Sequence, residues 1–187
     1  MTPRGATDRA GAVRAAFVSL VAQHGFHGAS MGAVAALAAV ATGTAYVHYS
    51  SKEELLYAAY LDVKRKLGLA AAAAVDHEAP PQQRFEQLWQ GVHDHLAADR
   101  DRARFLVQVD ASPYAEAAHE RAMAVDGDPL LAAATAPDMV ELFLPLPPRV
   151  LYDLAIGPVV RLVAAGRDLD PEVLGTLRQA CWQATTR

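Results

Sequence analysis

A short segment in the first third of the chain combines hydroxyl groups, a glycine, aromatic rings and a cation. These residues are Thr42, Gly43, Thr44, Tyr46, His48 and Lys52. Hydroxyls and exposed backbone N–H groups at the start of a helix donate hydrogen bonds to phosphate oxygens, and a lysine adds positive charge. Gly43 lets another molecule approach the backbone closely. The segment therefore predicts contact with a phosphate backbone, against the simpler interpretation of ordinary surface and helix-capping residues.

The helix that carries these groups is expected to be the second of two short helices. The pattern predicts helices over 31–38 and 42–49, with a tight connection at 39–41. Ser30 is a candidate N-cap for the first and a second candidate phosphate contact. Val40 is placed so that its apolar side chain can pack into the core and anchor the turn. Two short helices joined in this way describe a helix-turn-helix, whose second helix enters the major groove of DNA.

Longer helices flank the short pair. Apolar residues at 13, 17, 20 and 21 predict a helix over 7–24 that Gly25 ends. Ser51 is a strong N-cap for a second helix, which nothing breaks before residue 74 and which would span about 34 Å. We therefore expect a helix-turn-helix domain over 1–50 and a larger helical domain over 51–187, with 51–74 as the connecting helix.

The rest of the chain also predicts helices. The expected ranges are 80–96, 99–110, 113–125, 129–143, 148–165 and 171–185, and prolines suit the first turns of all of these except 99–110. Pro137 should bend the fourth of these, and Pro158 should kink the fifth. No run of alternating apolar and polar residues supports a strand, and alanine, the best helix former, is abundant. The predicted fold class is all-α.

The charge is unevenly distributed along the chain. The formal net charge of −4 argues, taken whole, against a nucleic-acid binder. Residues 1–66, however, hold seven basic and four acidic residues, a balance of +3, and the remainder has a balance of −7. This asymmetry favours a basic N-terminal part that meets a polyanion, although chance scatter of surface charge gives the same count.

The sequence also excludes several classes of protein. One cysteine, Cys181, allows no internal disulfide, and no secretory leader or long apolar run is visible, so we expect a cytoplasmic protein. No nucleophile elbow, phosphate-cradling loop or carboxylate cluster suggests an enzyme, and no cofactor is expected. His93 and His95 point about 200° apart on a helix, so they do not predict a metal site.

The N-terminal region resembles the DNA-binding domain of the TetR/AcrR family of bacterial transcriptional regulators. The resemblance is carried by the segments Gly25–Phe26, Ser30–Ala35 and Val40–Leu55. Three positions depart from the family pattern: Ala39 stands where the turn usually has glycine, Ala41 where the recognition helix usually has a Ser or Thr cap, and Ala45 where a larger aliphatic residue is usual. Thr42, one position later, would have to take over the cap.

The resemblance implies a homodimer that binds a double-stranded, palindromic DNA operator, most often as a repressor released by a small, largely apolar effector. The last two helices would form the dimer interface. Its candidate residues are Leu151, Leu154, Leu162, Val173, Leu177 and Trp182. The alternative from another class is a helical small-molecule-binding or scaffold protein whose helix-turn-helix no longer binds DNA.

Aromatic and sulfur-containing side chains of the larger domain are candidates for an effector pocket. They are Phe85, Trp89, His93, Phe105, Tyr114, Met123, Met139 and Phe143. The same helical spacing is typical of a hydrophobic core, so these residues are equally well interpreted as core.

Overall fold

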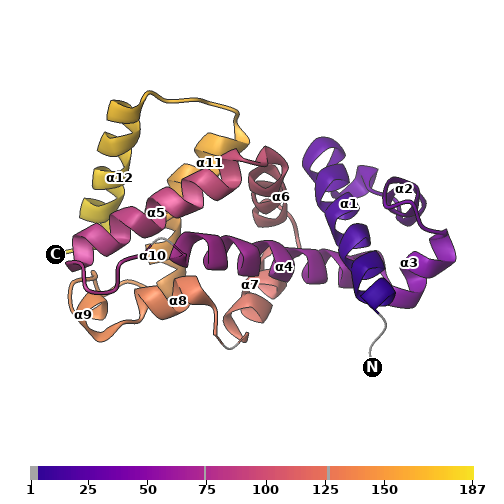
Figure 1. Cartoon of the computed structure of the whole chain (residues 1–187), viewed down its shortest axis with the longest axis horizontal. Helices are drawn as coiled ribbons and strands as arrows, with labels where there is room; N and C mark the ends of the chain where they lie inside the picture. Colours follow the sequence, from indigo (N-terminus) through magenta and orange to yellow (C-terminus); the bar gives the residue numbers. More distant parts are fainter. Residues whose placement is uncertain (1–3, 74, 126) are drawn as a thin grey trace.

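A long helix, α4, joins two groups of helices in the computed structural model, which describes residues 4–73, 75–125 and 127–187 (Figure 1). The smaller group contains α1 (Arg4–Gly28), α2 (Met31–Leu37) and α3 (Thr42–His48). Helix α4 (Lys52–Ala72) runs from this group into the larger one. No strand occurs among the described residues, only an isolated bridge between Phe143 and Thr186, and the all-α prediction is confirmed.

The larger group contains the remaining helices. They are α5 (Pro81–Ala97), α6 (Arg100–Asp110), α7 (Ala115–Met123), α8 (Pro129–Ala134), α9 (Pro137–Val140), α10 (Pro148–Ala155), α11 (Gly157–Ala164) and α12 (Pro171–Thr185). The helices predicted over 129–143 and 148–165 are each two helices. The breaks lie just before Pro137 and Pro158, because a proline lacks the N–H of the helical ladder and its ring clashes with the preceding turn.

The N-terminal helices follow their local signals closely. Gly25 has φ 70° and ψ 173°, so the helix kinks there, and one further turn reaches Gly28. Ser30 and Ser51 cap α2 and α4: their Oγ atoms accept hydrogen bonds from Ala33 N at 3.2 Å and Glu54 N at 3.1 Å. Each cap satisfies a backbone donor that the helix itself leaves unpaired.

The two groups of helices share one continuous core. Helix α1 packs along α6, where the rings of Phe17 and Phe105 meet edge to face with centroids 6.3 Å apart. Ser19 Oγ donates to Asp101 Oδ2 at 3.0 Å beside this contact. The boundary predicted at residue 50 therefore separates segments that remain in direct contact, and it stays a prediction.

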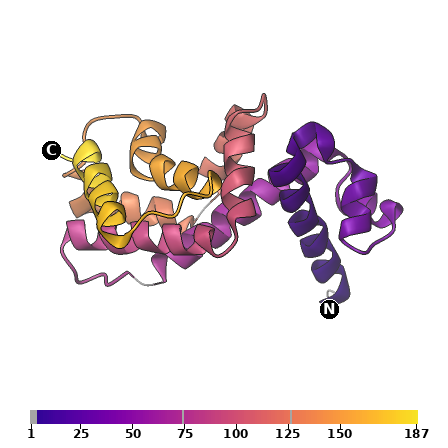
Figure 2. The same cartoon turned by 90° about the horizontal axis from the view of Figure 1, so that it is seen from above.

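The largest fully buried side chain is that of Trp89 on α5. Its indole N–H donates to Ala155 O at 3.1 Å, just before α10 gives way to α11. Seen from above, α12 lies at the end of the molecule opposite α1–α3 (Figure 2). No single described helix is long and apolar enough to cross a membrane, and α2 with α3, which reach such a length only together, are bent by 104° relative to each other.

Candidate nucleic-acid interface

Helix α3 presents its outer face to solvent at one end of the molecule (Figure 1). Its inner face buries Ala45 completely, whereas Tyr46 is 50% and Val47 83% exposed. Thr42 and Gly43 are also exposed, and a Cβ at Gly43 would meet nothing within 4 Å. The structure therefore places these predicted contact residues on one open surface. Val47 was missed by the sequence analysis, since nothing but the fold indicates that an apolar residue here faces outward.

The turn before α3 sets the direction of this surface. Helices α2 and α3 are bent by 104°, within the range of about 90–120° typical of a helix-turn-helix. Ala39 takes up φ 54°, the left-handed conformation that glycine usually supplies. Val40 N then donates to Ala35 O at 3.0 Å, which folds the half-buried Val40 back toward α2. The turn thus has the expected geometry without the expected glycine.

Helix α3 begins without a side-chain cap. Ala41 is its N-cap residue, with extended φ −67° and ψ 146°, and its carbonyl accepts from Thr44 N at 2.9 Å. The expectation that Thr42 takes over the cap is wrong, because Thr42 is already the first helical residue and a cap must stand before the first turn. The first backbone N–H groups of α3 consequently have no side-chain oxygen as a partner.

The remaining predicted contact residues lie at the edges of this surface. Thr44 and His48 are half-buried on α3, and Ser30 is exposed while its hydroxyl caps α2. Lys52 lies at the start of α4 with its Nζ 4.0 Å from the centroid of the Phe26 ring. Partial burial lowers the pKa of Lys52, although Glu53 opposes the shift. The aromatic ring holds this cation in a defined position beside the recognition helix.

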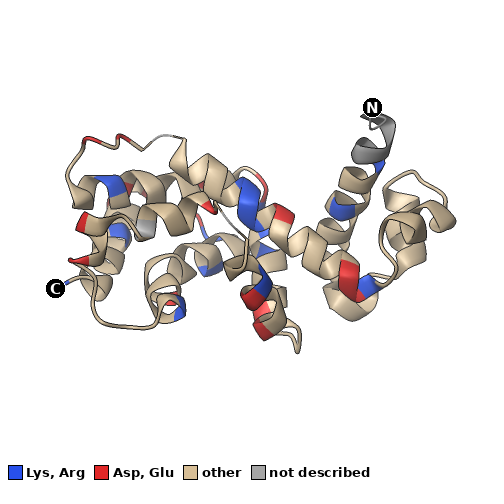
Figure 3. Ribbon diagram, turned by 90° about the horizontal axis from the view of Figure 1, so that it is seen from below, with Lys and Arg blue, Asp and Glu red and all other residues tan. Residues whose placement is uncertain are grey.

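Charge flanks the helix-turn-helix and does not lie on it. Helices α2 and α3 contain no Lys, Arg, Asp or Glu, whereas basic residues lie on α1 and at the start of α4 (Figure 3). Helix α3 therefore carries hydroxyl, aromatic and apolar groups, and the charged groups lie on its neighbours.

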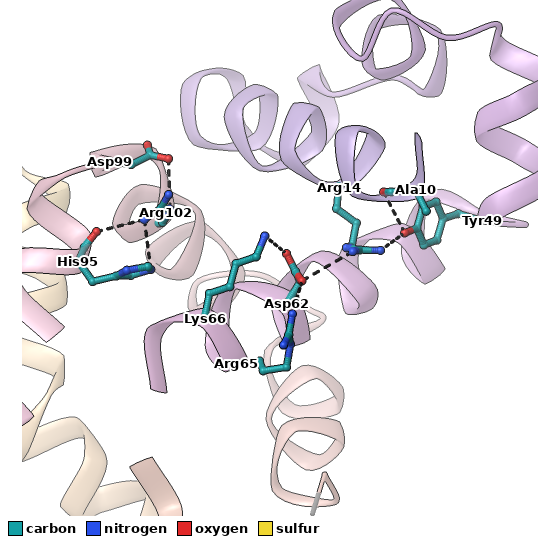
Figure 4. A network of polar contacts seen from close by, with 9 residues as sticks. All are labelled: Ala10, Arg14, Tyr49, Asp62, Arg65, Lys66, His95, Asp99 and Arg102. Atoms are coloured by element: carbon teal, nitrogen blue, oxygen red, sulfur yellow. Dashed lines mark hydrogen bonds and ion pairs between the residues drawn. The ribbon is translucent and has the colours of Figure 1, made fainter. Parts of the chain in front are cut away.

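An arginine connects the N-terminal helices. Arg14 on α1 donates from Nη1 to the Tyr49 hydroxyl at 2.6 Å, and that hydroxyl donates in turn to Ala10 O at 3.2 Å (Figure 4). Tyr49, directly after α3, is buried. The position of the C-terminal end of α3 is therefore tied to α1 by hydrogen bonds.

The same arginine reaches α4. Its Nη2 lies 3.7 Å from Asp62 Oδ1, and Asp62 also pairs with Lys66 at 2.6 Å and with Arg65 at 3.5 Å (Figure 4). Burial alone would raise the pKa of Asp62, but hydrogen bonds and charge from Lys66, with Arg14 and Arg65, hold it below its ordinary value. Asp62 thus remains an anion that links α4 to the helix supporting α3.

The candidate effector residues are divided between core and surface. Phe85, Trp89, Phe105 and Met139 are buried, and Met123 is 55% exposed. Tyr114, Phe143 and His93 are half-buried, with Tyr114 against Phe26 and His93 stacked on Trp89. None of the eight candidates lines the hollow around Tyr60 or the hollow around Asp62, so their role in an effector pocket stays a prediction.

A hollow of about 240 Å³ does lie among α4, α6, α10 and α11. Its polar lining residues are Tyr60, Asp110, Tyr152, Asp153 and Arg161, and its apolar ones include Leu106, Val107 and Val160. The sequence analysis missed this set, because its members lie on four helices distant in the chain. Among the described residues, no three His, Cys, Asp or Glu side chains gather in a way that would hold a metal ion.

The candidate dimer residues lie on incompletely covered helices. Leu151, Leu154, Leu162 and Leu177 are half-buried, and Val173 is 46% exposed. Trp182 is half-buried and contacts Phe85 of the same chain, with ring centroids 5.2 Å apart. Helix α10 buries none of its residues, and α12 buries only Cys181 and Thr185. The interface itself stays a prediction.

The three helices α1–α3 and the start of α4 define a helix-turn-helix DNA-binding unit. The family described as "Bacterial regulatory proteins, tetR family" matches this unit over residues 13–59. No curated protein matches the chain in sequence.

Solved structures extend the likeness over almost the whole chain. A TetR-family transcriptional regulator from Haemophilus influenzae RD has a TM-score of 0.81 at 22% identity, covering 98% of this chain and 100% of its own. A putative tetR family transcription regulator from Shewanella sp. PV-4 has a TM-score of 0.78 at 25% identity, covering 96% of this chain and 98% of its own. A putative TetR family transcriptional regulator from Vibrio parahaemolyticus has a TM-score of 0.71 at 28% identity, covering 96% of this chain and 99% of its own.

The sequence match of the N-terminal unit and the fold of the whole chain point to the same family. Residues 13–59 are similar to the tetR family of bacterial regulatory proteins, and the chain as a whole has the fold of TetR-family transcriptional regulators, with a helix-turn-helix DNA-binding domain.

Proposed function

We propose that the chain is a homodimeric, ligand-responsive regulator that binds a palindromic operator through α3 and leaves it when a small effector binds to the larger group of helices. Repression relieved by the effector is the simplest form of this regulation. The observation that carries the proposal is the open outer face of α3, where Tyr46 and Val47 project from a helix whose opposite face is buried.

The chemistry of this face suits the major groove. Thr42 and Thr44 offer hydroxyls to bases or phosphates, and the Val47 methyl groups suit the methyl group of a thymine. Lys52, together with the exposed Arg9 of α1, would neutralise phosphates on either side. In a dimer, two such helices would enter successive major grooves about 34–36 Å apart.

The long helix α4 offers a physical route for the ligand response. It carries Lys52 at one end, Asp62 in the contact with α1, and residues of the larger group beyond. An effector that favours one position of α4 would move the two recognition helices away from the spacing of the operator. A differential affinity of about 1–3 kcal/mol is enough to change operator binding several-fold or more.

Operator binding can be tested by fluorescence anisotropy on DNA selected from the chromosome that encodes the protein. Tyr46→Ala and Val47→Ala should each weaken binding by about 1–3 kcal/mol, the value of a base-edge contact. Val140→Ala is the matched control, because Val140 is 53% exposed on α9, outside the helix-turn-helix. Lys52→Ala should weaken binding to all DNA sequences. It should also reduce the slope of log affinity against log salt concentration by about one, the contribution of a single phosphate contact.

Unchanged affinity in Tyr46→Ala, Val47→Ala and Lys52→Ala together would refute the assignment of α3 to DNA. Binding without any salt dependence would refute it too, because neutralising phosphates releases counterions. The helical scaffold that does not bind DNA would then be the remaining interpretation.

A further inference from the structure

The hollow among α4, α6, α10 and α11 contains a buried hydroxyl that no described residue satisfies. Tyr60 on α4 is only 2% exposed, and its hydroxyl forms no hydrogen bond with the described residues. The hydroxyl is not among the fully enclosed unpaired atoms, so the small surface that Tyr60 retains includes it. Tyr60 itself lines the hollow, and of the four groups whose charge acts on its hydroxyl, Tyr152, Asp110 and Asp153 line the hollow as well, whereas Arg149 does not. The hydroxyl therefore faces the hollow.

The state of this hydroxyl follows from its surroundings. Burial raises the pKa of Tyr60 far above its ordinary value, and the negative charges of Asp110 and Asp153 raise it further. The phenol consequently keeps its proton at neutral pH and acts as a hydrogen-bond donor. Because this donor faces the hollow and has no acceptor among the described residues, it is available to a ligand that brings an acceptor.

A second donor lies on α11. Arg161 is exposed at the rim of the same hollow and forms no ion pair or side-chain hydrogen bond with the described residues, so its guanidinium is available to a ligand. Its guanidinium lies against Gly157, where a Cβ would stand 2.8 Å from Nη2. The absence of a side chain at Gly157 thus leaves room for the guanidinium at the hollow. Arginine presents several N–H donors in a planar fork that matches a carboxylate.

The carboxylates of the hollow, in contrast, already have partners. Asp110 accepts a hydrogen bond from Nε2 of His119 at 2.9 Å, because Arg149 contacts the Nδ1 of this histidine and a guanidinium can only donate. Asp153 lies 3.9 Å from Arg149 Nε. The polar lining groups left without hydrogen-bond or ion-pair partners among the described residues are the hydroxyls of Tyr60 and Tyr152 and the guanidinium of Arg161, each of which can donate, and much of the remaining lining is apolar.

We propose that this hollow is the effector site and that it binds a small carboxylic acid with an apolar body. The carboxylate accepts hydrogen bonds from the Tyr60 hydroxyl and the Arg161 guanidinium, and the body lies against Leu106, Val107 and Val160. A volume of about 240 Å³ limits the ligand to the size of an aromatic or short-chain acid. The proposal rests on the ligand response described above, and it names the class of ligand.

The position of Tyr60 also connects this site to DNA binding. Tyr60 stands two residues before Asp62, which pairs with Arg14 of α1. A ligand held by Tyr60 on α4 and Arg161 on α11 therefore acts on the helix whose position determines that of α3. The effector would favour one position of α4 and the operator another, so binding of one would weaken binding of the other.

Isothermal titration calorimetry of the full chain tests the site with benzoate and hexanoate, and with benzylamine as the cation of matched shape. Both acids should bind saturably, and benzylamine at least tenfold more weakly. Tyr60→Phe and Arg161→Gln should each raise the Kd for the acids by about 10- to 100-fold, because each removes a hydrogen bond to a charged group.

Two variants serve as matched controls. Tyr57→Phe removes a hydroxyl from the same helix at a residue that packs on Tyr114, and Arg167→Gln removes an exposed guanidinium outside the hollow. Both should leave the Kd for the acids within twofold of the unsubstituted chain. Helical circular dichroism should be the same for all four variants.

Three results would overturn the inference: no saturable binding of either acid, tighter binding of benzylamine, or an unchanged Kd in both Tyr60→Phe and Arg161→Gln. If operator binding is intact in these cases, the DNA-binding assignment stands and only the ligand class fails. Acid binding that follows the expected pattern while the operator affinity is unaffected by benzoate would instead refute the proposed ligand response and leave the site intact.

Discussion

The turn of the helix-turn-helix is strained at one residue, and relieving that strain should stabilise the protein. Ala39 has φ 54° and is the one non-glycine residue with positive φ among the described part of the chain. The left-handed conformation costs a residue with a Cβ about 1–2 kcal/mol, whereas glycine adopts it freely. Ala39 is exposed, so Ala39→Gly removes little packing.

The expected gain is smaller than the strain, because glycine also loses more backbone entropy on folding. That loss is about 0.5–1 kcal/mol relative to alanine. The difference predicts that Ala39→Gly stabilises the folded chain by about 0.5–1 kcal/mol. Ala36→Gly is the matched control: Ala36 is also exposed but lies inside α2, where glycine costs about 1 kcal/mol.

Urea unfolding followed by helical circular dichroism measures both variants at one fixed protein concentration. Ala39→Gly should move the midpoint upward and Ala36→Gly downward, with the slope m unchanged in both. Operator affinity should be retained in Ala39→Gly, because the turn keeps its direction. Equal destabilisation by the two variants would refute the reasoning, since it would mean that residue 39 is not held in the left-handed conformation.

Two further predictions concern α4 and α12. The pKa of Asp62 is lowered in the folded state, so its contribution to stability is present above the unfolded pKa, about 3.9, and is lost as the pH falls through the lower folded value. Asp62→Asn should therefore destabilise the chain at pH 7 and reduce the loss of stability in acid; urea midpoints that differ equally at pH 7 and pH 3 would contradict this. Val173→Asp should convert the dimer to monomer in analytical ultracentrifugation while Val140→Asp does not, because Val173 is exposed on the helix assigned to the interface; a dimer in both variants would exclude Val173 from it.

The sequence predicted features that depend on neighbours within a few residues. Ser30 and Ser51 cap their helices because each hydroxyl accepts a hydrogen bond from a backbone N–H three residues later. Pro137 and Pro158 break helices through their own rings. The departure at Ala39 was also visible, since a turn that usually requires glycine lacks one here. The helix-turn-helix and the all-α class follow from such local rules.

The tertiary structure decided which side chains remain available. Helical spacing cannot distinguish a core aromatic from one that lines a hollow, because both face inward. The indole N–H of Trp89 donates to Ala155 O, whereas the hydroxyl of Tyr60 faces the hollow beside α11. The pairing of Arg14 with Asp62 and the outward direction of Val47 likewise depend on how distant helices cross. The helix caps, the helix breaks and the helix-turn-helix segment were thus predictable from the sequence alone. Which polar side chains find a hydrogen-bond partner and which do not was decided only by the tertiary structure.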